Sequence, residues 1–338
     1  MTPLVPFVRS PDNGPNAALV DALCRAAPDL DVRVLGEIAP ERLHEVTVAI
    51  ADGPSEGQLA RLPNLRLVQS TWAGVEAILP VLPAGVEVAR MVDPRLAETM
   101  AEAVLAWTLH LHRDMPRYAR QQRNGQWIVH ELVHASHRRV GVLGLGVLGR
   151  AAVETLRDHG FDVTGWSRSP KSIDGVECFH DGLDGGGVDA LLRRSDIVVN
   201  LLPHTEATTG LLGAAAFAQM PTGSSLINFG RGPTVDDEAL LAALDDGPTS
   251  GASDTGSRVT GARLDRAHLE HAVLDVFVTE PLPEGHPYWS HPRVTVLPHV
   301  SGPTSAETAA VIAAANVRAF LVDGTLPADA LVDRTRGY

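Results

Sequence analysis

The chain alternates short apolar runs with amphipathic or turn-rich stretches over most of its length. In the first third, apolar runs at 32–35, 46–50 and 65–68 predict strands, and the pattern at 96–111 predicts a long helix after Pro94, suited to a linker or a subunit interface. Further strand-like runs cover residues 139–143, 162–166, 197–202, 225–229, 272–277 and 294–297. Helical stretches separate most of these runs, so the pattern predicts an α/β fold with a doubly wound parallel sheet.

One later segment lacks this alternation, and the last stretch of the chain has a helical pattern. Residues 246–266 are rich in Gly, Ser, Thr and Asp and have no apolar period, which predicts a mobile surface insertion. Residues 304–321 have the pattern of an amphipathic helix that ends at Gly324.

Length and charge narrow the possible partners. The 338 residues allow two domains, and a net charge of −13 disfavours binding to nucleic acid or anionic lipid. Cys24 and Cys178 lie far apart, with no spacing that indicates a disulfide framework or a zinc knuckle. No secretory signal and no apolar run of about 18 residues occur. We therefore expect a cytoplasmic protein with neither a nucleic-acid nor a membrane partner.

A glycine-rich turn follows the apolar run at 139–143 and precedes a helical pattern at 151–159. Strand, glycines and helix in this order are typical of a dinucleotide-binding loop. Gly144 permits the tight turn, Gly146 lets the backbone approach a pyrophosphate, and Gly149 lets the helix pack close to the strand. The helix N-terminus favours the negative charge of the diphosphate.

The next strand indicates which nicotinamide cofactor the loop would bind. Sites for NAD usually carry an acid about 20 residues after the glycines, but residues 165–169 read GWSRS and contain no carboxylate. Arg168, with Ser167 and Lys171, is suited to a 2′-phosphate, so the sequence favours NADPH. NADH stays possible, because a solvated arginine beside a permissive NAD site is the alternative interpretation.

Three polar residues follow the last predicted strands, where ligands of α/β sheets bind. They are Arg231, Glu280 and His299. Reduction of a ketone needs a hydride, a proton donor for the developing alkoxide, and positive charge for the substrate carboxylate and carbonyl. NAD(P)H, His299 and Arg231 would supply these three functions, and Glu280 would favour the protonated imidazole.

One competing pattern points to a metal site. Residues 130–134 match the HExxH spacing of zinc proteases. That pattern needs a stable helix and a third ligand, whereas this segment ends a few residues before the glycine-loop strand, so we predict no metal. Three aromatic residues, Trp127, Tyr288 and Trp289, are predicted as core or subunit-contact residues.

Several motifs in order along almost the entire chain resemble those of the D-2-hydroxyacid dehydrogenases, and within that family most closely those of glyoxylate/hydroxypyruvate reductases. The motifs are STWAGV at 70–75, GLGVLG at 144–149, WSRS at 166–169, NLLP at 200–203, NFGRG at 228–232, LDVFVTEPLP at 274–283 and Pro298-His299.

This resemblance implies roles for particular residues. Arg231 would bind the substrate carboxylate and carbonyl, Glu280 would pair with the acid/base His299, and Asp275 would contact the nicotinamide end of the cofactor. Backbone amides of Trp72, Ala73 and Gly74 would bind the substrate carboxylate. The implied cofactor-binding set is Gly144, Gly146, Leu148, Gly149, Ser167, Arg168, Ser169, Leu202, Pro203, Phe229, Gly230, Arg231, Asp275 and His299.

The resemblance also implies an organisation into two Rossmann-like parallel-sheet domains with an interdomain active-site cleft. Residues 1–97 and 304–338 would form the substrate domain and residues 98–303 the dinucleotide-binding domain. Family members are typically homodimers through the nucleotide domain, so we expect a homodimer here. In similar reductases, tryptophans near Trp127 and Trp289 line the substrate mouth.

The expected reaction is reduction of a small 2-keto acid, such as glyoxylate or hydroxypyruvate, to the D-2-hydroxy acid. Gly230 stands where the family commonly has a small side chain, and Leu297 where it commonly has threonine, but neither change removes a reacting group. A dinucleotide-sensing corepressor or scaffold on the same fold is the main alternative. Glu280 argues against a formate dehydrogenase, and the short stretch after the terminal helix argues against a phosphoglycerate dehydrogenase with a regulatory domain.

Overall fold

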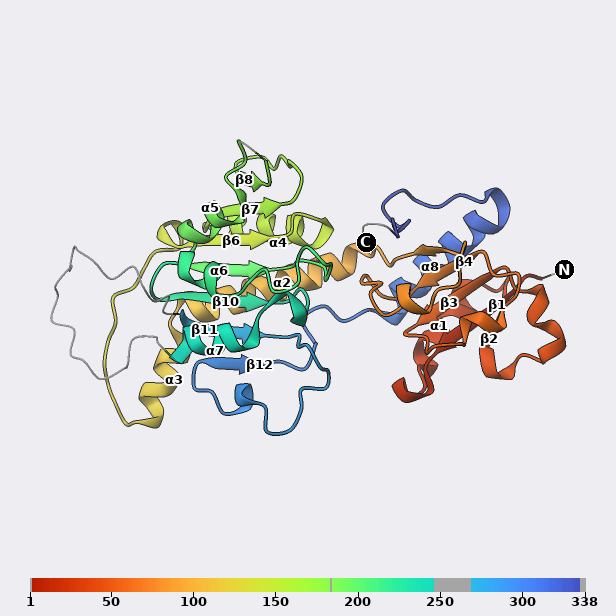
Figure 1. Ribbon diagram of the computed structural model, residues 1–338, viewed down its shortest axis with the longest axis horizontal. Helices are drawn as coiled ribbons and strands as arrows, with labels where there is room; N and C mark the ends of the chain where they lie inside the picture. The colour runs from red at the N-terminus through yellow and green to blue at the C-terminus, as the bar shows by residue number, and fades with distance from the viewer. Residues whose placement is uncertain (1, 183, 246–268, 335–338) are drawn as a thin grey trace. The chain divides into compact units, whose positions relative to one another are not determined.

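The computed structural model describes residues 2–182, 184–245 and 269–334 and divides the chain into two compact units (Figure 1). The first unit comprises Met1–Leu96 and Pro303–Tyr338, and the second comprises Ala97–Gly302. Each unit contains a parallel sheet, which confirms the predicted α/β class with two Rossmann-like domains. The predicted mobile insertion at 246–266 lies outside the described residues.

The first unit is built on a five-stranded sheet in the order β2-β1-β3-β4-β5. Its strands are β1 (Leu4–Arg9), β2 (Asp31–Val34), β3 (Val48–Asp52), β4 (Leu67–Ser70) and β5 (Glu87–Ala89). Helices α1 (Ala17–Ala26) and α8 (Ala306–Asp323) pack against each other and cover one face. Short 3₁₀ turns cover the other face, at Leu35–Glu37, Pro40–Glu45, Leu59–Arg61 and Leu79–Val81.

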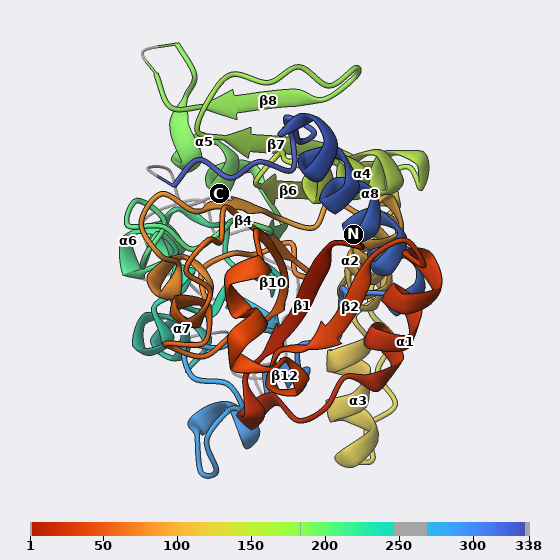
Figure 2. The ribbon, with the colours of Figure 1, turned by 90° about the vertical axis from the view of Figure 1, so that its right-hand side faces the viewer.

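Alternation of side chains along the strands explains why both faces of this sheet are apolar. In β1, Val5 and Phe7 pack with the α1 and α8 side chains, whereas Leu4 and Val8 pack with the 3₁₀ turns. Because successive side chains of a strand point to opposite faces, a strand buried on both sides shows a continuous apolar run. Figure 2 shows β1 and β2 of this sheet side by side.

The second unit is built on a seven-stranded sheet in the order β12-β11-β10-β9-β6-β7-β8. Its strands are β6 (Arg139–Leu143), β7 (Asp162–Ser167), β8 (Glu177–His180), β9 (Ile197–Asn200), β10 (Ser224–Asn228), β11 (Leu269–Leu274) and β12 (Val294–Val296). The sequence pattern did not predict β8, an edge strand beside β7 (Figure 2). This short strand begins with the exposed Glu177 and ends with the polar His180, and none of its four residues is fully buried, so its apolar signal is weak.

Helices cover both faces of this second sheet. The helices are α2 (Pro94–His112), α3 (Met115–Arg123), α4 (Val147–Asp158), α5 (Gly187–Arg194), α6 (Ala214–Gln219) and α7 (Asp237–Asp245). One core joins α2 and α4 to side chains such as Val199 and Ile227, and the other joins α5, α6 and α7 to side chains such as Val198 and Leu226. This is the predicted doubly wound arrangement.

All strands of the second sheet run parallel, so their carboxyl ends lie along the same edge. The segments that follow β6, β7, β9, β10 and β11 therefore begin at this edge, which is where α/β sheets bind ligands. Among the described residues, no helix has the length and apolar character needed to cross a membrane.

Candidate active site

The glycine turn after β6 leads directly into helix α4. Gly144 has φ 97°, a left-handed conformation that favours glycine, and its N–H donates to the Trp166 carbonyl at 2.8 Å. Gly146 stands at the N-cap of α4 and has no side chain that would occupy the first amides. A Cβ on Gly149 would lie 1.7 Å from the Gly144 carbonyl oxygen, so only glycine fits this approach. The turn and the open helix N-terminus suit a diphosphate.

The end of β7 carries the residues predicted to select the cofactor. Ser167 is buried, and its hydroxyl donates to the Ser169 carbonyl at 2.6 Å, which shapes the turn. Arg168, Ser169 and Lys171 are exposed. The turn itself, residues 167–171, contains no carboxylate that would repel a phosphate.

Arg231 follows β10 in a loop that approaches two neighbouring segments closely. Its Nη1 donates to the Gly230 carbonyl at 2.7 Å. A Cβ on Gly230 would lie 2.7 Å from the Leu202 carbonyl oxygen, and a Cβ on Gly232 would lie 2.0 Å from the Phe277 carbonyl carbon. Glycine on both sides of Arg231 therefore lets this loop pack against the segments after β9 and β11. The closeness at Gly230 also explains why this chain has no side chain there.

Other members of the predicted cofactor-binding set lie in segments that follow strands of the second sheet. Leu202 is buried and Pro203 partly buried in the segment after β9, while Phe229 and Gly230 are buried in the segment after β10. Leu148 is partly buried in the first turn of α4. The structure thus distributes these residues over segments that follow three neighbouring strands of one sheet.

Glu280 and His299 form a hydrogen-bonded pair. His299 Nδ1 lies 2.8 Å from Glu280 Oε2, and Glu280 Oε1 accepts from the Phe277 N–H at 2.9 Å. The bond to Glu280 raises the pKa of His299 above its ordinary value, although partial desolvation opposes this. Desolvation by itself would raise the pKa of Glu280, but the bonds from His299 and the Phe277 N–H outweigh it and lower that pKa. The geometry favours a charged imidazolium beside a carboxylate.

Asp275 fixes the backbone that carries His299. Its Oδ1 accepts from the Val300 N–H at 2.8 Å and its Oδ2 from the Ser301 N–H at 2.9 Å. His299 itself has φ 54°, an uncommon conformation for a residue with a side chain, and the two bonds hold the turn that follows it. Asp275 also adds to the rise in the pKa of His299. Sequence reasoning missed this positioning contact, because no local motif couples the end of β11 to residues 300 and 301.

The three polar residues after the strands lie close enough to interact electrostatically. The positive charge of Arg231 lowers the pKa of Glu280 and also opposes the rise in the pKa of His299. A proton donor, its carboxylate partner and a cation are thus brought together on one unit.

The Trp72 segment belongs to the first unit and follows β4. The Trp72 N–H donates to Ser70 Oγ at 2.9 Å, and the Trp72 carbonyl accepts from the Met91 N–H at 2.9 Å. In the part of the chain that the structure describes, no hydrogen bond engages the N–H groups of Ala73 and Gly74. These two amides, rather than that of Trp72, are the available donors for an anion.

The HExxH segment lacks the helix that a zinc protease needs. Residues 126–134 have no regular secondary structure. His130 Nε2 contacts Gln121 Nε2 at 2.5 Å, whereas His134 Nδ1 contacts Ser136 Oγ at 2.9 Å. Across the described ranges, no group of three or more His, Cys, Asp or Glu side chains is arranged to hold a metal ion.

The aromatic residues predicted as core or subunit-contact residues lie in different environments. Tyr288 is buried, and its hydroxyl donates to Asp237 Oδ1 at 2.9 Å. Trp289 is exposed and donates through Nε1 to the Pro283 carbonyl at 3.0 Å. Trp127 is 96% exposed, so it is not a core residue of the single chain.

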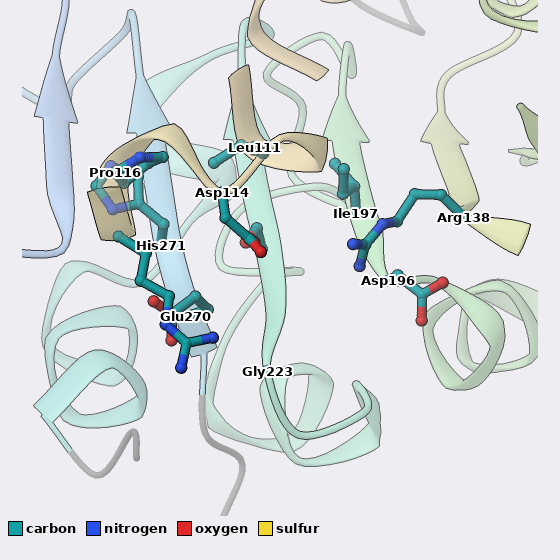
Figure 3. A pocket seen from close by; sticks show the side chains of 11 residues that line it. Leu111, Asp114, Pro116, Arg138, Asp196, Ile197, Gly223, Glu270 and His271 are labelled. Carbon is teal, nitrogen blue, oxygen red and sulfur yellow. The ribbon is translucent and has the colours of Figure 1, made fainter. Parts of the chain in front are cut away.

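Figure 3 shows a pocket at the opposite edge of the second sheet, near the amino ends of β9, β10 and β11. Its lining includes Asp114 from the turn between α2 and α3, together with Asp196, Glu270 and His271. None of the predicted catalytic or cofactor residues lines it. It is therefore separate from the candidate active site at the carboxyl edge.

Known proteins resemble this chain in sequence and in fold. A family model described as the NAD binding domain of D-isomer specific 2-hydroxyacid dehydrogenases matches residues 105–255 and 261–301. The chain belongs to the D-isomer specific 2-hydroxyacid dehydrogenase family. It is accordingly an NAD(P)-dependent 2-hydroxyacid dehydrogenase, and the matched region lies within the second unit.

Relatives of this dehydrogenase include named reductases and solved structures. Glyoxylate/hydroxypyruvate reductase A of Serratia proteamaculans is 37% identical over 292 residues, covering 84% of this chain and 85% of the relative. A family member from Xanthobacter autotrophicus Py2, solved with NADPH and MES, is 39% identical with a TM-score of 0.85, covering 100% of each chain. The NADPH-dependent glyoxylate/hydroxypyruvate reductase of Sinorhizobium meliloti, solved with NADP and sulfate, is 30% identical with a TM-score of 0.84, covering 99% of each chain.

Proposed function

We propose that this dehydrogenase reduces a small 2-keto acid of the glyoxylate or hydroxypyruvate type to the D-2-hydroxy acid, with NADPH as its preferred reductant. The observation that carries the proposal is the His299–Glu280 pair, with Nδ1 and Oε2 2.8 Å apart, within electrostatic reach of Arg231. Ketone reduction needs both a proton donor and a cation that binds a carboxylate.

Each residue of this set has a distinct role in the proposed reaction. Bound NADPH supplies a hydride to the carbonyl carbon. Arg231 pairs with the substrate carboxylate and polarises the carbonyl oxygen. Because Nδ1 of His299 is bound to Glu280, Nε2 is the nitrogen that gives its proton to the oxygen as the carbonyl double bond is lost. Solvent then reprotonates His299, which completes the balance of the reaction.

NADPH is proposed as the preferred cofactor on two grounds. Arg168 is exposed on a turn without a carboxylate, and a guanidinium pairs well with a 2′-phosphate. Relatives from Xanthobacter autotrophicus and Sinorhizobium meliloti were solved with NADPH and NADP, respectively. NADH remains a usable but weaker cofactor in this proposal.

The substrate class rests on the named relatives and on chemistry that the chain offers. The Serratia and Sinorhizobium relatives are glyoxylate/hydroxypyruvate reductases. We propose that the Trp72, Ala73 and Gly74 segment binds the substrate carboxylate through the amides of Ala73 and Gly74.

The test follows NADPH oxidation by absorbance with glyoxylate, hydroxypyruvate, pyruvate and longer 2-keto acids. His299→Ala should lower kcat by about 10²- to 10⁴-fold while NADPH still binds. His159→Ala, an exposed histidine in the same unit, is the matched control and should retain full activity. Tight NADPH binding by the unmodified protein without turnover of any 2-keto acid would instead support a dinucleotide-sensing role.

A further inference from the structure

A buried network of polar side chains lies beneath the loop that carries Arg231. Asn200 ends β9, Asn228 ends β10, and Thr234 lies just beyond Arg231; all three side chains are at most 1% exposed. Polar groups buried to this extent are costly unless they are hydrogen-bonded, so their contacts indicate what the network holds.

Asn200 is the centre of this network. Its Nδ2 donates to Asn228 Oδ1 at 2.9 Å and to Thr234 Oγ1 at 2.7 Å. Its Oδ1 accepts from the Leu202 N–H at 3.2 Å. One amide side chain therefore links a predicted cofactor segment to the loop of the substrate-binding arginine.

Thr234 is the branch that reaches Arg231. Its hydroxyl accepts from Asn200 and donates to the Arg231 carbonyl at 2.6 Å, which is closer than the backbone bond from the Thr234 N–H to the same carbonyl at 3.3 Å. Asn228 Nδ2 makes a longer contact of 3.4 Å to that carbonyl. Among the described residues, Thr234 makes no hydrogen bond to the Leu202 segment, so the two branches separate at Asn200.

We propose that Thr234, held by Asn200, is a positioning residue that sets where Arg231 presents its guanidinium to the 2-keto acid. The inference rests on the proposed function, because it assigns Arg231 to the substrate. Loss of the hydroxyl removes the shortest bond to the Arg231 carbonyl and leaves one Asn200 donor without its acceptor. A shifted guanidinium weakens substrate binding, whereas the Leu202 branch of Asn200 keeps its bond.

Three variants separate positioning from general damage. Thr234→Val keeps the shape of the side chain but removes the hydroxyl, and Thr234→Ser keeps the hydroxyl. Thr108→Val is the matched control, because Thr108 is also fully buried in the same unit and its hydroxyl has no partner among the described residues. Thermal unfolding of each variant reports global stability.

Thr234→Val should raise KM for glyoxylate or hydroxypyruvate by roughly tenfold or more and leave KM for NADPH within roughly twofold. Thr234→Ser should restore the unmodified values, and Thr108→Val should not change them. Equal KM values for all variants would overturn the inference, and so would a parallel rise in KM for the acid and for NADPH.

Hydrogen–deuterium exchange makes the outcome independent of turnover. Amides at 229–236 should exchange faster in Thr234→Val than in Thr108→Val or Thr234→Ser, since the loop loses a bond. If the unmodified protein reduces no 2-keto acid, the proposed function fails, and the exchange still decides whether Thr234 holds the loop. Unchanged exchange in Thr234→Val would overturn the inference by itself.

Discussion

His299 Nδ1 lies 2.8 Å from Glu280 Oε2, and the other oxygen of Glu280 accepts from the Phe277 N–H at 2.9 Å. The carboxylate is thus fixed on both sides, and it orients the imidazole as well as raising its pKa. Because Nδ1 is bound to Glu280, Nε2 is the ring nitrogen that is left to donate a proton to the substrate in the proposed reaction. Asp275 adds a second constraint through the amides of Val300 and Ser301.

Glu280→Gln should shift the pH profile of the reductase reaction. Reduction needs protonated His299, so kcat/KM falls as the pH rises through the pKa of His299. Since the bond to Glu280 raises that pKa, its neutral replacement should move this limb of the profile to lower pH. The measurement is kcat/KM against pH, with NADPH saturating.

Glu284→Gln provides the control for that experiment. Glu284 is an exposed carboxyl only four residues further along the same segment. Its replacement should leave the midpoint of the limb unchanged. An unchanged midpoint in Glu280→Gln as well would contradict the role assigned to the pair.

Gly146→Ala and Gly149→Ala should damage the protein in different ways. A Cβ on Gly146 would meet no atom within 4 Å, whereas a Cβ on Gly149 would lie 1.7 Å from the Gly144 carbonyl oxygen. Gly146→Ala should keep its Tm and raise KM for NADPH, because it obstructs only the proposed diphosphate. Gly149→Ala should lower Tm, because the start of α4 must move. An unaltered NADPH affinity in Gly146→Ala would argue against this location of the diphosphate.

Much of the fold was predictable because the central strands of both sheets are buried on two faces. Runs such as 197–200 and 225–228 are buried at every position and are apolar at their centres, and the glycine turn follows its strand in the order that a dinucleotide loop requires. The predicted runs at 197–202 and 272–277 extend beyond the ends of β9 and β11. Their apolar character continues there because Leu202 and Val276 are also buried, although outside the ladder.

Contacts between distant segments were not predictable in the same way. The bonds from Val300 and Ser301 to Asp275 join residues 25 or more positions apart, and those from Asn200 reach Asn228 and Thr234. A single sequence records the residue types but not these partners. Gly232 offered a signal in its position beside Arg231, yet its approach to Phe277 depends on how two loops pack.

Arg168→Ala should reduce the preference for NADPH over NADH. Loss of a charge-assisted contact to the 2′-phosphate should raise KM for NADPH by about 10- to 100-fold and change KM for NADH little. Arg157→Ala is the control, because Arg157 is a partly buried arginine of the same unit that lies outside the proposed cofactor set, and it donates to the Asp174 carbonyl at 2.6 Å. An equal rise in KM for NADPH and for NADH would show that Arg168 does not select the 2′-phosphate.

His271 should make unfolding sensitive to acid. This histidine of β11 is 4% exposed and contacts Thr295 Oγ1 through Nε2 at 2.9 Å. Desolvation, assisted by the positive charge of Arg120, lowers the pKa of His271 to about 3. Above the ordinary histidine pKa of about 6.5, His271 is neutral in both the folded and the unfolded protein, and its contribution to the folding stability is fully present. Below that pH, His271 takes up a proton in the unfolded chain before it does so in the folded protein. Stability is therefore lost as the pH falls from that value towards 3.

Denaturant unfolding at pH 7.5 and 5.0 tests this linkage. Between these values, the free energy of unfolding should fall by about 2 kcal/mol more in the unmodified protein than in His271→Gln. His159→Gln, which replaces an exposed histidine of the same unit, should keep the full acid sensitivity. If His271→Gln loses as much stability as the unmodified protein, other groups are responsible for the acid sensitivity.

Trp127 should contribute to a homodimer. Trp127 is 96% exposed, and Ile128, Val129 and Leu132 are exposed beside it in the segment without regular structure. Clustered exposed apolar side chains indicate a protein contact. We expect sedimentation to give a dimer for the unmodified protein and a monomer for Trp127→Glu combined with Val129→Glu, because two buried charges would oppose association. Val322→Glu, on an exposed apolar position of α8, should stay dimeric; an unmodified monomer, or an unaltered mass in the double variant, would contradict this assignment.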